Sequence, residues 1–379
     1  MQRLVALVLD NSLLLLFGAG AAVVFANVDL ASYEHLAHPL HFWVNDVAMA
    51  FFFALAAKEV FEATLPGGSL ASPQRAAMPL AAAAGGMLIP ALIFVTMVSF
   101  RGPAALSRGW AIPCATDIAF SAMVARFIFG RAHPAVPFLL LLAIADDALG
   151  LVILAVFYTA APLSLVPLLA LMTAAVLAAL WLRRRRVRSF WPYILGPGVL
   201  SWAALYAGGV HPSLALVPVI PFMPHGDRDL GLFEASESRR PDTLSRFEHW
   251  WATPVQLVLL AFGFVNAGVP FASTGPGTWY VMAALLIGKP VGILGATGLA
   301  RMLGARLPEG LRIADLSIVS VAASIGFTVS LFFATAAFAA GPALDETKMG
   351  ALLSLAAAPL AVAAAWVVGV WRPARSKAI

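Results

Sequence analysis

The stretch from Phe138 to Leu154 places two adjacent carboxylates, Asp146 and Asp147, in the middle of a long apolar run. No other acidic or basic residue occurs between His133 and Arg183. A charge near the centre of a membrane helix costs about 2.5–3.5 kcal/mol, and two neighbouring carboxylates also repel each other. A chain can retain such a pair only where a cation, a proton or a fixed counter-ion stabilises it.

The composition is that of a membrane protein. The 379 residues are 61% hydrophobic and only 11% charged, whereas about 25% charged is typical of soluble domains. About 20 apolar residues span a bilayer, so the sequence predicts an all-α polytopic membrane protein. The single cysteine, Cys114, excludes an intrachain disulfide and disfavours a cysteine metal site. The net charge of +5 comes from Arg residues scattered between apolar runs and does not indicate a nucleic-acid partner.

Apolar runs and the turn signals between them predict about twelve transmembrane helices in one domain that covers residues 1–379. The first run has no convincing cleavage pattern and is expected to remain as a helix. The seventh and eighth spans are short and read either as two helices or as one broken element. The twelve spans are expected at 11–29, 42–63, 76–99, 109–130, 134–158, 163–182, 191–206, 210–223, 252–271, 278–300, 312–340 and 348–371.

The distribution of positive charge predicts the orientation of the chain. With a cytoplasmic N-terminus, most of the 24 Lys and Arg residues fall on the cytoplasmic side, as the positive-inside rule requires. Only Arg101, Arg108 and Lys348 fall outside, and Lys289 falls within a span. Both termini and the polar loop at about 225–249 are therefore expected in the cytoplasm.

Two spans are interrupted. Span four contains Pro113, which removes a backbone donor and disfavours helix just before it. Span eleven contains a small, polar patch around Gly326. A break in a helix at membrane depth is tolerated only where the irregular backbone is buried in protein or lines a water-filled cavity. Because the two spans run in opposite directions, the sequence predicts inverted repeats, spans 3–5 and 10–12, whose discontinuous helices cross near the bilayer midplane.

Four charges lie deep in the predicted spans: Asp117, Asp146, Asp147 and Lys289. Neighbouring residues on a helix point about 100° apart, so one carboxylate of the Asp pair can meet Lys289 while the other faces a cavity and Asp117. Carboxylates, helped by Thr116 and free carbonyls, offer hard oxygen ligands to Na⁺ or Li⁺. In a desolvated site the same carboxylates also take up protons, so competition between cation and proton would suffice for antiport.

Several motifs in this order resemble one family. Ala-Thr-Asp117-Ile-Ala-Phe is followed by Ala143-Ile-Ala-Asp-Asp147, by Gly-Lys289-Pro and by Ile325-Gly-Phe-Thr-Val-Ser. Together with Trp43-Val-Asn-Asp and Gly68-Ser-Leu-Ala-Ser, they make nearly the whole chain similar to the bacterial NhaA sodium/proton antiporters.

The resemblance implies a secondary active transporter that exports cytoplasmic Na⁺ or Li⁺ in exchange for external protons, electrogenically and by alternating access. Asp147 is then the principal ion and proton carboxylate, Asp146 pairs with Lys289, and Asp117 compensates charge at the crossing. The family implies pH homeostasis, a bacterial inner-membrane location and no cofactor.

The chain also departs from the family pattern. Ala148 separates the Asp pair from Leu149, and Glu62 stands where the family has a basic residue. The family's cytoplasmic pH-sensing cluster corresponds here to Glu59, Glu248 and His249, so pH activation is expected to be altered or absent. The loop at about 30–41 is too short for the family's dimerising β-hairpin, so a homodimer would need another interface.

Plainer interpretations remain open for most of these residues. The Asp pair could be structural and bound only to Lys289, Asp117 could stabilise a helix break, and Asp46 could face a helix N-terminus instead of lining the ion path. His211, otherwise a residue of the ion path or pH response, could make a structural hydrogen bond, and Glu59, Glu248 and His249 could be solvated. Two further features outside the ion path are interpreted structurally. The Arg183–Arg188 run is a topology anchor that touches anionic lipid, and Asn266 makes a helix–helix hydrogen bond.

Other functions are less well matched. A transporter of the same fold could carry K⁺ or an organic anion, although the three deep carboxylates outnumber the one deep lysine. An intramembrane aspartyl protease needs Tyr-Asp and Gly-x-Gly-Asp contexts, and a metalloprotease needs His-Glu-x-x-His; the sequence has none of them. The chain is therefore not expected to be an enzyme.

Overall fold

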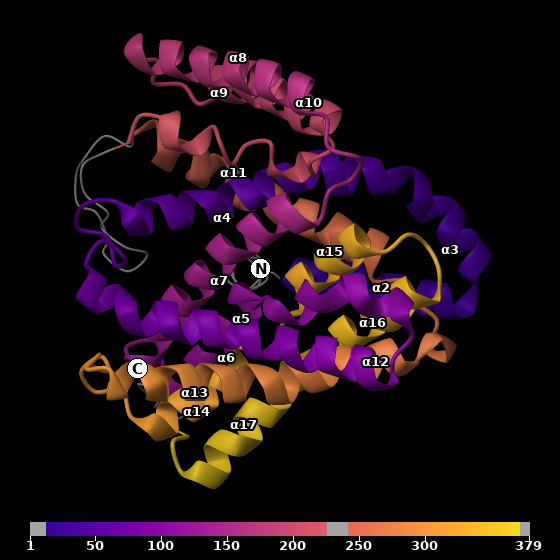
Figure 1. The fold of residues 1–379 in the computed structure, drawn as a ribbon, viewed down its shortest axis with the longest axis vertical. Helices are drawn as coiled ribbons and strands as arrows, with labels where there is room; N and C mark the ends of the chain where they lie inside the picture. Colours follow the sequence, from indigo (N-terminus) through magenta and orange to yellow (C-terminus); the bar gives the residue numbers. More distant parts are fainter. Residues whose placement is uncertain (1–12, 226–241, 372–379) are drawn as a thin grey trace, which may run out of the picture. The chain divides into compact units, whose positions relative to one another are not determined.

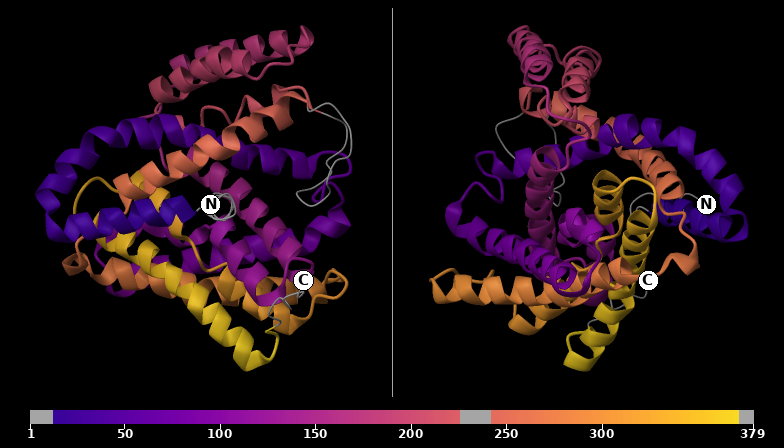
Figure 2. Two further views of the ribbon diagram at one scale, coloured as in Figure 1. Left: turned by 180° about the vertical axis from the view of Figure 1, so that it is seen from behind. Right: turned by 45° about the vertical axis from the view of Figure 1, so that its right-hand side comes forward.

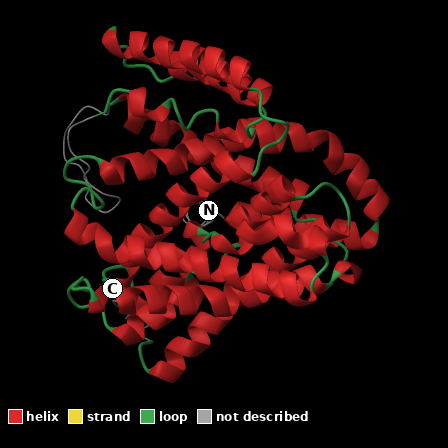
Figure 3. Ribbon diagram, viewed as in Figure 1, coloured by secondary structure: helices red, strands yellow, loops and turns green. Residues whose placement is uncertain are grey.

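The computed structural model describes residues 13–225 and 242–371, with side chains described throughout except at 73–75. Within these ranges every regular element is a helix, as Figure 3 shows, which confirms the predicted all-α class. Residues 1–12, 226–241 and 372–379 lie outside the described ranges. The predicted cytoplasmic positions of both termini, and of the central part of the polar loop, fall in these segments.

Membrane-spanning helices dominate the described residues. Two bent pairs, Ala104–Cys114 with Ile118–Phe129 (49°) and Ile313–Ala322 with Phe327–Ala337 (47°), have the length and composition of interrupted spans. The chain is thus a polytopic membrane protein. Six continuous helical stretches are long and apolar enough to span a bilayer: Leu30–Thr64, Ala76–Arg101, Ala135–Phe157, Leu165–Arg184, Pro276–Met302 and Pro342–Val368.

The chain folds into two compact units, each assembled from distant segments. The first unit comprises residues 1–72 and 148–268, and the second comprises 73–147 and 269–379. The division falls directly after Asp147, so the Asp pair belongs to the second unit.

In the first unit α2 packs along α11. In the same unit α8 packs along α10, as Figure 1 shows. A Cβ on Gly18 of α2 would lie 2.1 Å from the carbonyl oxygen of Leu260, so glycine allows α2 and α11 to approach this closely. The elements are α2 (Leu13–Val28), α3 (Leu30–Ala37), η1 (His38–Leu40), η2 (Phe42–Ala48), α4 (Met49–Thr64), α8 (Leu165–Arg184), α9 (Trp191–Tyr193), η4 (Ile194–Gly198), α10 (Val199–Gly208), η5 (Pro212–Leu214), η6 (Ile220–Phe222) and α11 (Thr243–Asn266).

Two predictions for the first unit are wrong. The expected loop at 30–41 is helical and runs into α4, because Asp29 caps the N-terminus of α3 by accepting a hydrogen bond from Ser32 N. The expected span at 210–223 is not a continuous helix but turns with two short 3-10 helices. Three prolines in that segment lack the N–H that a helix needs.

The helix α11 begins earlier than the sequence predicts. Its N-cap is Asp242, whose carboxylate accepts a 2.7 Å hydrogen bond from Ser245 N. Residues 243–249, expected in the polar loop, are therefore helical, and Glu248 and His249 lie on the first turns of α11.

In the second unit α5 lies along α13, as the views in Figure 2 also show. A Cβ on Gly85 would lie 2.2 Å from Gly292 O, and one on Gly292 would lie 2.1 Å from Gly85 O, so this pair permits backbone contact. The elements are α5 (Pro73–Arg101), η3 (Ala104–Cys114), α6 (Ile118–Phe129), α7 (Ala135–Phe157, whose end belongs to the first unit), η7 (Phe271–Ser273), α12 (Pro276–Ala283), η8 (Ala284–Gly288), α13 (Lys289–Met302), α14 (Ile313–Ala322), α15 (Phe327–Ala337), α16 (Pro342–Leu353), η9 (Ser354–Ala356) and α17 (Ala357–Val368).

The predicted repeats correspond to two matching series of elements. The series α5, η3 with α6, and α7 has a broken span in the middle. The series α12 to α13, α14 with α15, and α16 to α17 has its broken span at the same place. Both breaks thus lie in the second unit, where they meet.

Candidate functional site

The broken ends of the two interrupted spans contact each other. After η3 ends at Cys114, Ala115 and Asp117 have extended backbone before α6 begins. Asp117 N donates a 2.7 Å hydrogen bond to Ile325 O, which lies between α14 and α15. Irregular backbone in an apolar environment must find such partners, and here each break supplies them to the other.

Asp117 caps the N-termini of both half-helices. Phe120 N of α6 donates to its Oδ1 at 3.3 Å, and Thr328 N of α15 donates to its Oδ2 at 3.2 Å. The Thr328 hydroxyl also donates to Oδ2. A carboxylate is favoured at the positive end of a helix dipole, and Asp117 lies at two such ends.

Asp146 and Lys289 form a fully buried ion pair. Lys289 Nζ lies 3.4 Å from Asp146 Oδ2, and Thr116 Oγ1 donates to the same oxygen at 2.6 Å. Lys289 Nζ also donates a 2.7 Å hydrogen bond to Cys114 O, at the C-terminal end of η3. The negative end of that half-helix therefore adds to the stabilisation of the lysine.

One carboxylate oxygen in this cluster has no hydrogen-bond partner. Asp146 Oδ1 is buried and lacks a partner among the described residues. Leaving a buried polar atom unpaired costs free energy, and a proton or a small hard cation would satisfy this oxygen. Asp147 is half-buried and interacts electrostatically with Lys289. The described residues contain no group of three or more His, Cys, Asp or Glu side chains that could hold a metal.

The helix-break residues border this cluster. Pro113 is buried in the last turn of η3, and Gly326 is the N-cap of α15. Thr116 lies in the extended segment between η3 and α6 and is fully buried. The second unit therefore brings together Asp117, Asp146, Lys289 and Thr116, with Asp147 at the next position of α7.

Asp46 and His211 lie together in the first unit. His211 Nδ1 is 3.8 Å from Asp46 Oδ1 and 2.9 Å from Ser213 Oγ. Trp202 Nε1 donates to Asp46 O at 2.9 Å. Because helical structure already begins at Leu30, Asp46 does not stand at a helix N-terminus, and the interpretation of Asp46 as a dipole partner is wrong.

One of the predicted pH-sensing residues, Glu248, contacts a lysine that the sequence did not single out. Lys58 is buried, and its Nζ lies 2.6 Å from Glu62 Oε2 and 2.6 Å from Glu248 Oε2. The spacing of Lys58 and Glu62, four residues apart on a helix, could have revealed the first contact. Glu59 is half-buried and His249 is exposed. We call Lys58, Glu62 and Glu248 the Lys58 cluster.

The predicted interhelical hydrogen bond of Asn266 is confirmed. Its amide pairs reciprocally with that of Asn45, through Nδ2–Oδ1 distances of 3.0 and 2.9 Å. This pair joins α11 to η2 inside the first unit.

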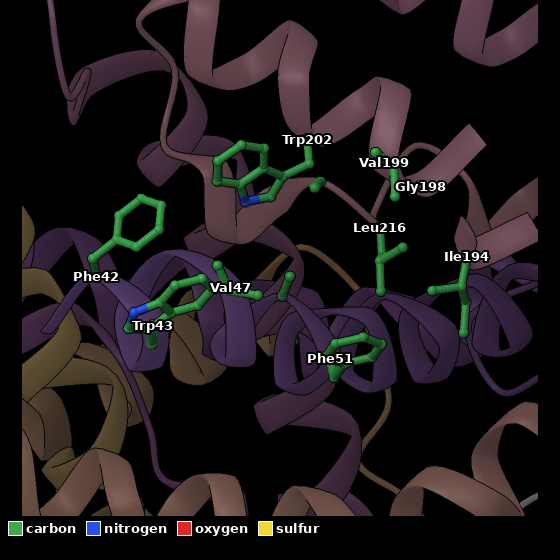
Figure 4. Close-up of a pocket in the computed structure, with 11 residues that line it drawn as sticks. Phe42, Trp43, Val47, Phe51, Ile194, Gly198, Val199, Trp202 and Leu216 are labelled. Carbon is green, nitrogen blue, oxygen red and sulfur yellow. The ribbon is translucent and has the colours of Figure 1, made fainter. Parts of the chain in front are cut away.

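An apolar cavity of about 380 Å³ in the first unit does not contain the predicted ion-binding residues. Figure 4 shows Trp43, Phe51 and Trp202 among the side chains around it. The side chains that line it include no acidic or basic group. The lining residues are Phe42, Trp43, Val47, Ala50, Phe51, Ile194, Gly198, Val199, Trp202, Ala215 and Leu216.

Comparison with known proteins identifies the family. The family model described as Na+/H+ antiporter 1 matches residues 1–368. A solved structure of the sodium proton antiporter MjNhaP1 from Methanocaldococcus jannaschii has a TM-score of 0.53 at 15% identity, over 95% of this chain and 91% of that one. At that identity the likeness shows the fold alone.

Full-length relatives support the same assignment, and each is named Na(+)/H(+) antiporter NhaA. The chain is 45% identical to the protein from Geotalea uraniireducens, with 98% of each chain covered. It is 44% identical to the one from Jannaschia sp., covering 96% of this chain and 97% of the relative, and 43% identical to the one from Geobacter metallireducens, covering 98% and 100%. With a family model matched over nearly its whole length and relatives of this identity, the chain belongs to the Na+/H+ antiporter 1 family.

Proposed function

We propose that this protein is a secondary active antiporter that exports cytoplasmic Na⁺ or Li⁺ in exchange for external protons. Membership of the antiporter family supports the exchange reaction. The exchange is electrogenic, with more than one proton per cation, if the Asp146–Lys289 pair titrates together with Asp147.

The observation that carries this proposal is the buried Oδ1 of Asp146, beside Asp147, which has no hydrogen-bond partner in the described part of the chain. A proton or a Na⁺ ion can satisfy this oxygen, but both cannot do so together. The Thr116 hydroxyl, which bonds to the other oxygen of the same carboxylate, is a further hard oxygen ligand. Binding of Na⁺ at Asp146 and Asp147 therefore displaces protons, and protonation displaces Na⁺.

Asp117 and Lys289 have compensating roles in this proposal. Asp117 balances the positive ends of two half-helices, whether or not a cation is bound. Lys289 keeps its hydrogen bond to Cys114 O when a cation or proton occupies Asp146. Alternating access then exposes the same carboxylates to one side of the membrane at a time, with the two units acting as one transport domain.

The predicted residues of the first unit act in the ion path or in the response of transport to pH. Asp46 and His211 belong to the ion path or the pH response, as do Glu59, Glu248 and His249. Because Lys58 is bonded to both Glu62 and Glu248, the pH response differs from that of family members with a basic residue at position 62.

The protein acts in the bacterial inner membrane with both termini in the cytoplasm, contributes to pH homeostasis, is not an enzyme and needs no cofactor. Its partners are membrane lipid, a monovalent cation and protons. A homodimer, if it forms, uses an interface other than a β-hairpin, since residues 30–41 are helical.

Purified protein in liposomes tests the proposal. The vesicles have an acid interior and a fluorescent pH dye, and Na⁺, Li⁺ and K⁺ are added in turn between pH 6.5 and 9. We expect Na⁺ and Li⁺ to dissipate the pH gradient, and Asp147→Asn protein to respond to neither. A response to K⁺ alone, or none to any monovalent cation, would reject sodium/proton exchange.

A further inference from the structure

Two buried serines tie the broken spans together at equivalent positions. Ser121 on α6 and Ser330 on α15 each lie four residues after the N-cap of their helix. Ser330 Oγ donates to Ile112 O at 2.6 Å, and Ser121 Oγ donates to Ala322 O at 3.0 Å. Both serines are fully buried. Each therefore binds the last turn of the opposing half-helix.

The two serine hydrogen bonds hold segments that differ in how many hydrogen bonds they make to the Asp146–Lys289 ion pair. Ile112, held by Ser330, lies in the last turn of η3, which ends at Cys114 and leads into the extended segment that contains Thr116. Cys114 O accepts from Lys289, and the Thr116 hydroxyl donates to Asp146. The segment 112–116 thus supplies two of the hydrogen bonds that fix the buried ion pair.

The segment held by Ser121 supplies much less. Ala322 ends α14, and the neighbouring Ala323 O is only a second, 3.2 Å acceptor for the Thr116 hydroxyl. That hydroxyl has its closer partner, at 2.6 Å, in Asp146. Ser121 is therefore a matched control for Ser330, with the same chemistry and burial but with weaker connection to the carboxylates.

Gly326 provides the space that the Ser330 hydroxyl occupies. A Cβ at position 326 would lie 2.6 Å from Ser330 Oγ and 3.1 Å from Ala115 O. The φ of Gly326 is −106°, which any residue can adopt, so the requirement for glycine here is space and not backbone conformation. The predicted helix-break glycine thus leaves room for the bond from Ser330 to Ile112.

We propose that Ser330 is a positioning residue of the cation site: its hydroxyl fixes the segment 112–116 and thereby the groups that orient Lys289 and Asp146. This inference rests on the proposed Na⁺/H⁺ exchange and adds a residue that determines its cation affinity. Ser330 need not touch the ion, because it acts through Ile112.

The test compares Ser330→Ala with Ser121→Ala in two assays. One measures Na⁺-dependent proton exchange in liposomes, and the other measures direct binding of ²²Na⁺ to purified protein. For Ser330→Ala we expect the KM and the Kd for Na⁺ to rise about tenfold, as loss of one buried hydrogen bond predicts. Turnover at saturating Na⁺ should stay within about twofold of wild type, because the carboxylates remain.

Further variants keep the test decisive. Ser121→Ala should leave the Na⁺ affinity within about twofold, because the segment it holds connects to the ion pair only through the longer hydrogen bond of the Thr116 hydroxyl. Ser330→Cys, a weaker donor, should fall between wild type and alanine. Gly326→Ala, which displaces the hydroxyl without removing it, should also weaken Na⁺ binding and carries the test if Ser330→Ala does not fold.

Opposite outcomes separate the two proposals. Wild-type affinity in both Ser330→Ala and Gly326→Ala, or equal losses in Ser330→Ala and Ser121→Ala, would overturn the positioning role while leaving antiport intact. A wild-type protein that neither exchanges nor binds Na⁺ would reject the proposed function, and the positioning role with it.

Discussion

Lys289 and Lys58 are both buried lysines beside carboxylates, but their surroundings differ. The side chains of Lys289 and Asp146 are wholly inaccessible. The Lys58 cluster instead reaches the surface, where the side chains of Glu62 and Glu248 are 23% and 37% exposed. Solvent can therefore stabilise charge on these glutamates, but not on Asp146.

The pairing also differs between the two clusters. Lys58 has carboxylate oxygens at 2.6 Å from two glutamates. Lys289 has one carboxylate at 3.4 Å and a backbone carbonyl at 2.7 Å, and Asp146 retains an oxygen without a partner among the described residues. Burial with incomplete pairing therefore sets Asp146 apart from the glutamates of the Lys58 cluster, and the proposed binding of a proton or cation would complete its pairing.

The largest expected effect is loss of transport on replacing a carboxylate of the buried site. Asp147→Asn should reduce Na⁺/H⁺ exchange by about a hundredfold or more, because a charged ligand contributes roughly 3 kcal/mol. The matched change in the Lys58 cluster, Glu62→Gln, should retain exchange within about threefold at its optimal pH. The assay is proton flux in liposomes at saturating Na⁺. Similar losses of exchange in both variants would contradict the distinction between the buried site and the Lys58 cluster.

Replacing each lysine tests whether the two clusters differ in their contribution to the stability of the fold. Lys289→Ala leaves Asp146 without its counter-charge and should lower stability by about 3 kcal/mol, unless Asp146 takes up a proton. Lys58→Ala should cost about 1 kcal/mol, since water can reach both glutamates. Thermal unfolding in detergent measures the stability of both lysine variants. Adding Asp146→Asn to the Lys289→Ala protein should restore much of the stability that Lys289→Ala loses. Equal losses in the two lysine variants would contradict the contrast.

A smaller effect is expected for Asp117, which is fully hydrogen-bonded. Asp117→Asn keeps a side-chain acceptor but removes the charge at two helix N-termini, which should cost about 1–2 kcal/mol of stability. Turnover should fall about tenfold, with a lesser change in the KM for Na⁺. Steady-state exchange across Na⁺ concentrations measures both parameters. A rise in KM with unchanged turnover would instead make Asp117 a cation ligand.

The smallest effect is expected in the Lys58 cluster. Glu248→Gln should shift the pH profile of exchange by less than about one pH unit, since its charge is partly solvated. The profile is measured between pH 6.5 and 9 and compared with that of His249→Ala, whose side chain is exposed. Complete loss of exchange in Glu248→Gln would show that this cluster belongs to the transport site.

Sequence predicted the features of the site that are local or carry charge. The aspartates in an apolar run, the proline in span four and the small residues around Gly326 each destabilise a transmembrane helix, so the sequence alone identifies them as unusual. The hydrogen bonds of Thr328, Ser121 and Ser330 were missed, because a serine or threonine in a transmembrane helix usually bonds to its own backbone. Only the crossing of the two breaks gives them distant partners.

The errors in the fold have equally specific causes. Residues 30–41 are polar enough for a loop, but Asp29 caps a helix there, and the Tyr33 hydroxyl anchors it by donating to carbonyls at the end of α11. The segment 210–223 is apolar enough for a span, but its prolines and packing against the core of the first unit favour turns. Hydrophobicity predicts burial, whereas the backbone donors decide whether a buried segment is helical.

In the proposed mechanism, the carboxylates of Asp146 and Asp147 bind either Na⁺ or protons. Its most direct test is the addition of Na⁺ to purified, weakly buffered protein, with released protons and bound ²²Na⁺ measured together at several pH values. We predict proton release on Na⁺ binding and an apparent Na⁺ affinity that strengthens as pH rises, both lost in Asp147→Asn. Sodium binding of constant affinity across pH, with no proton released, would contradict the account.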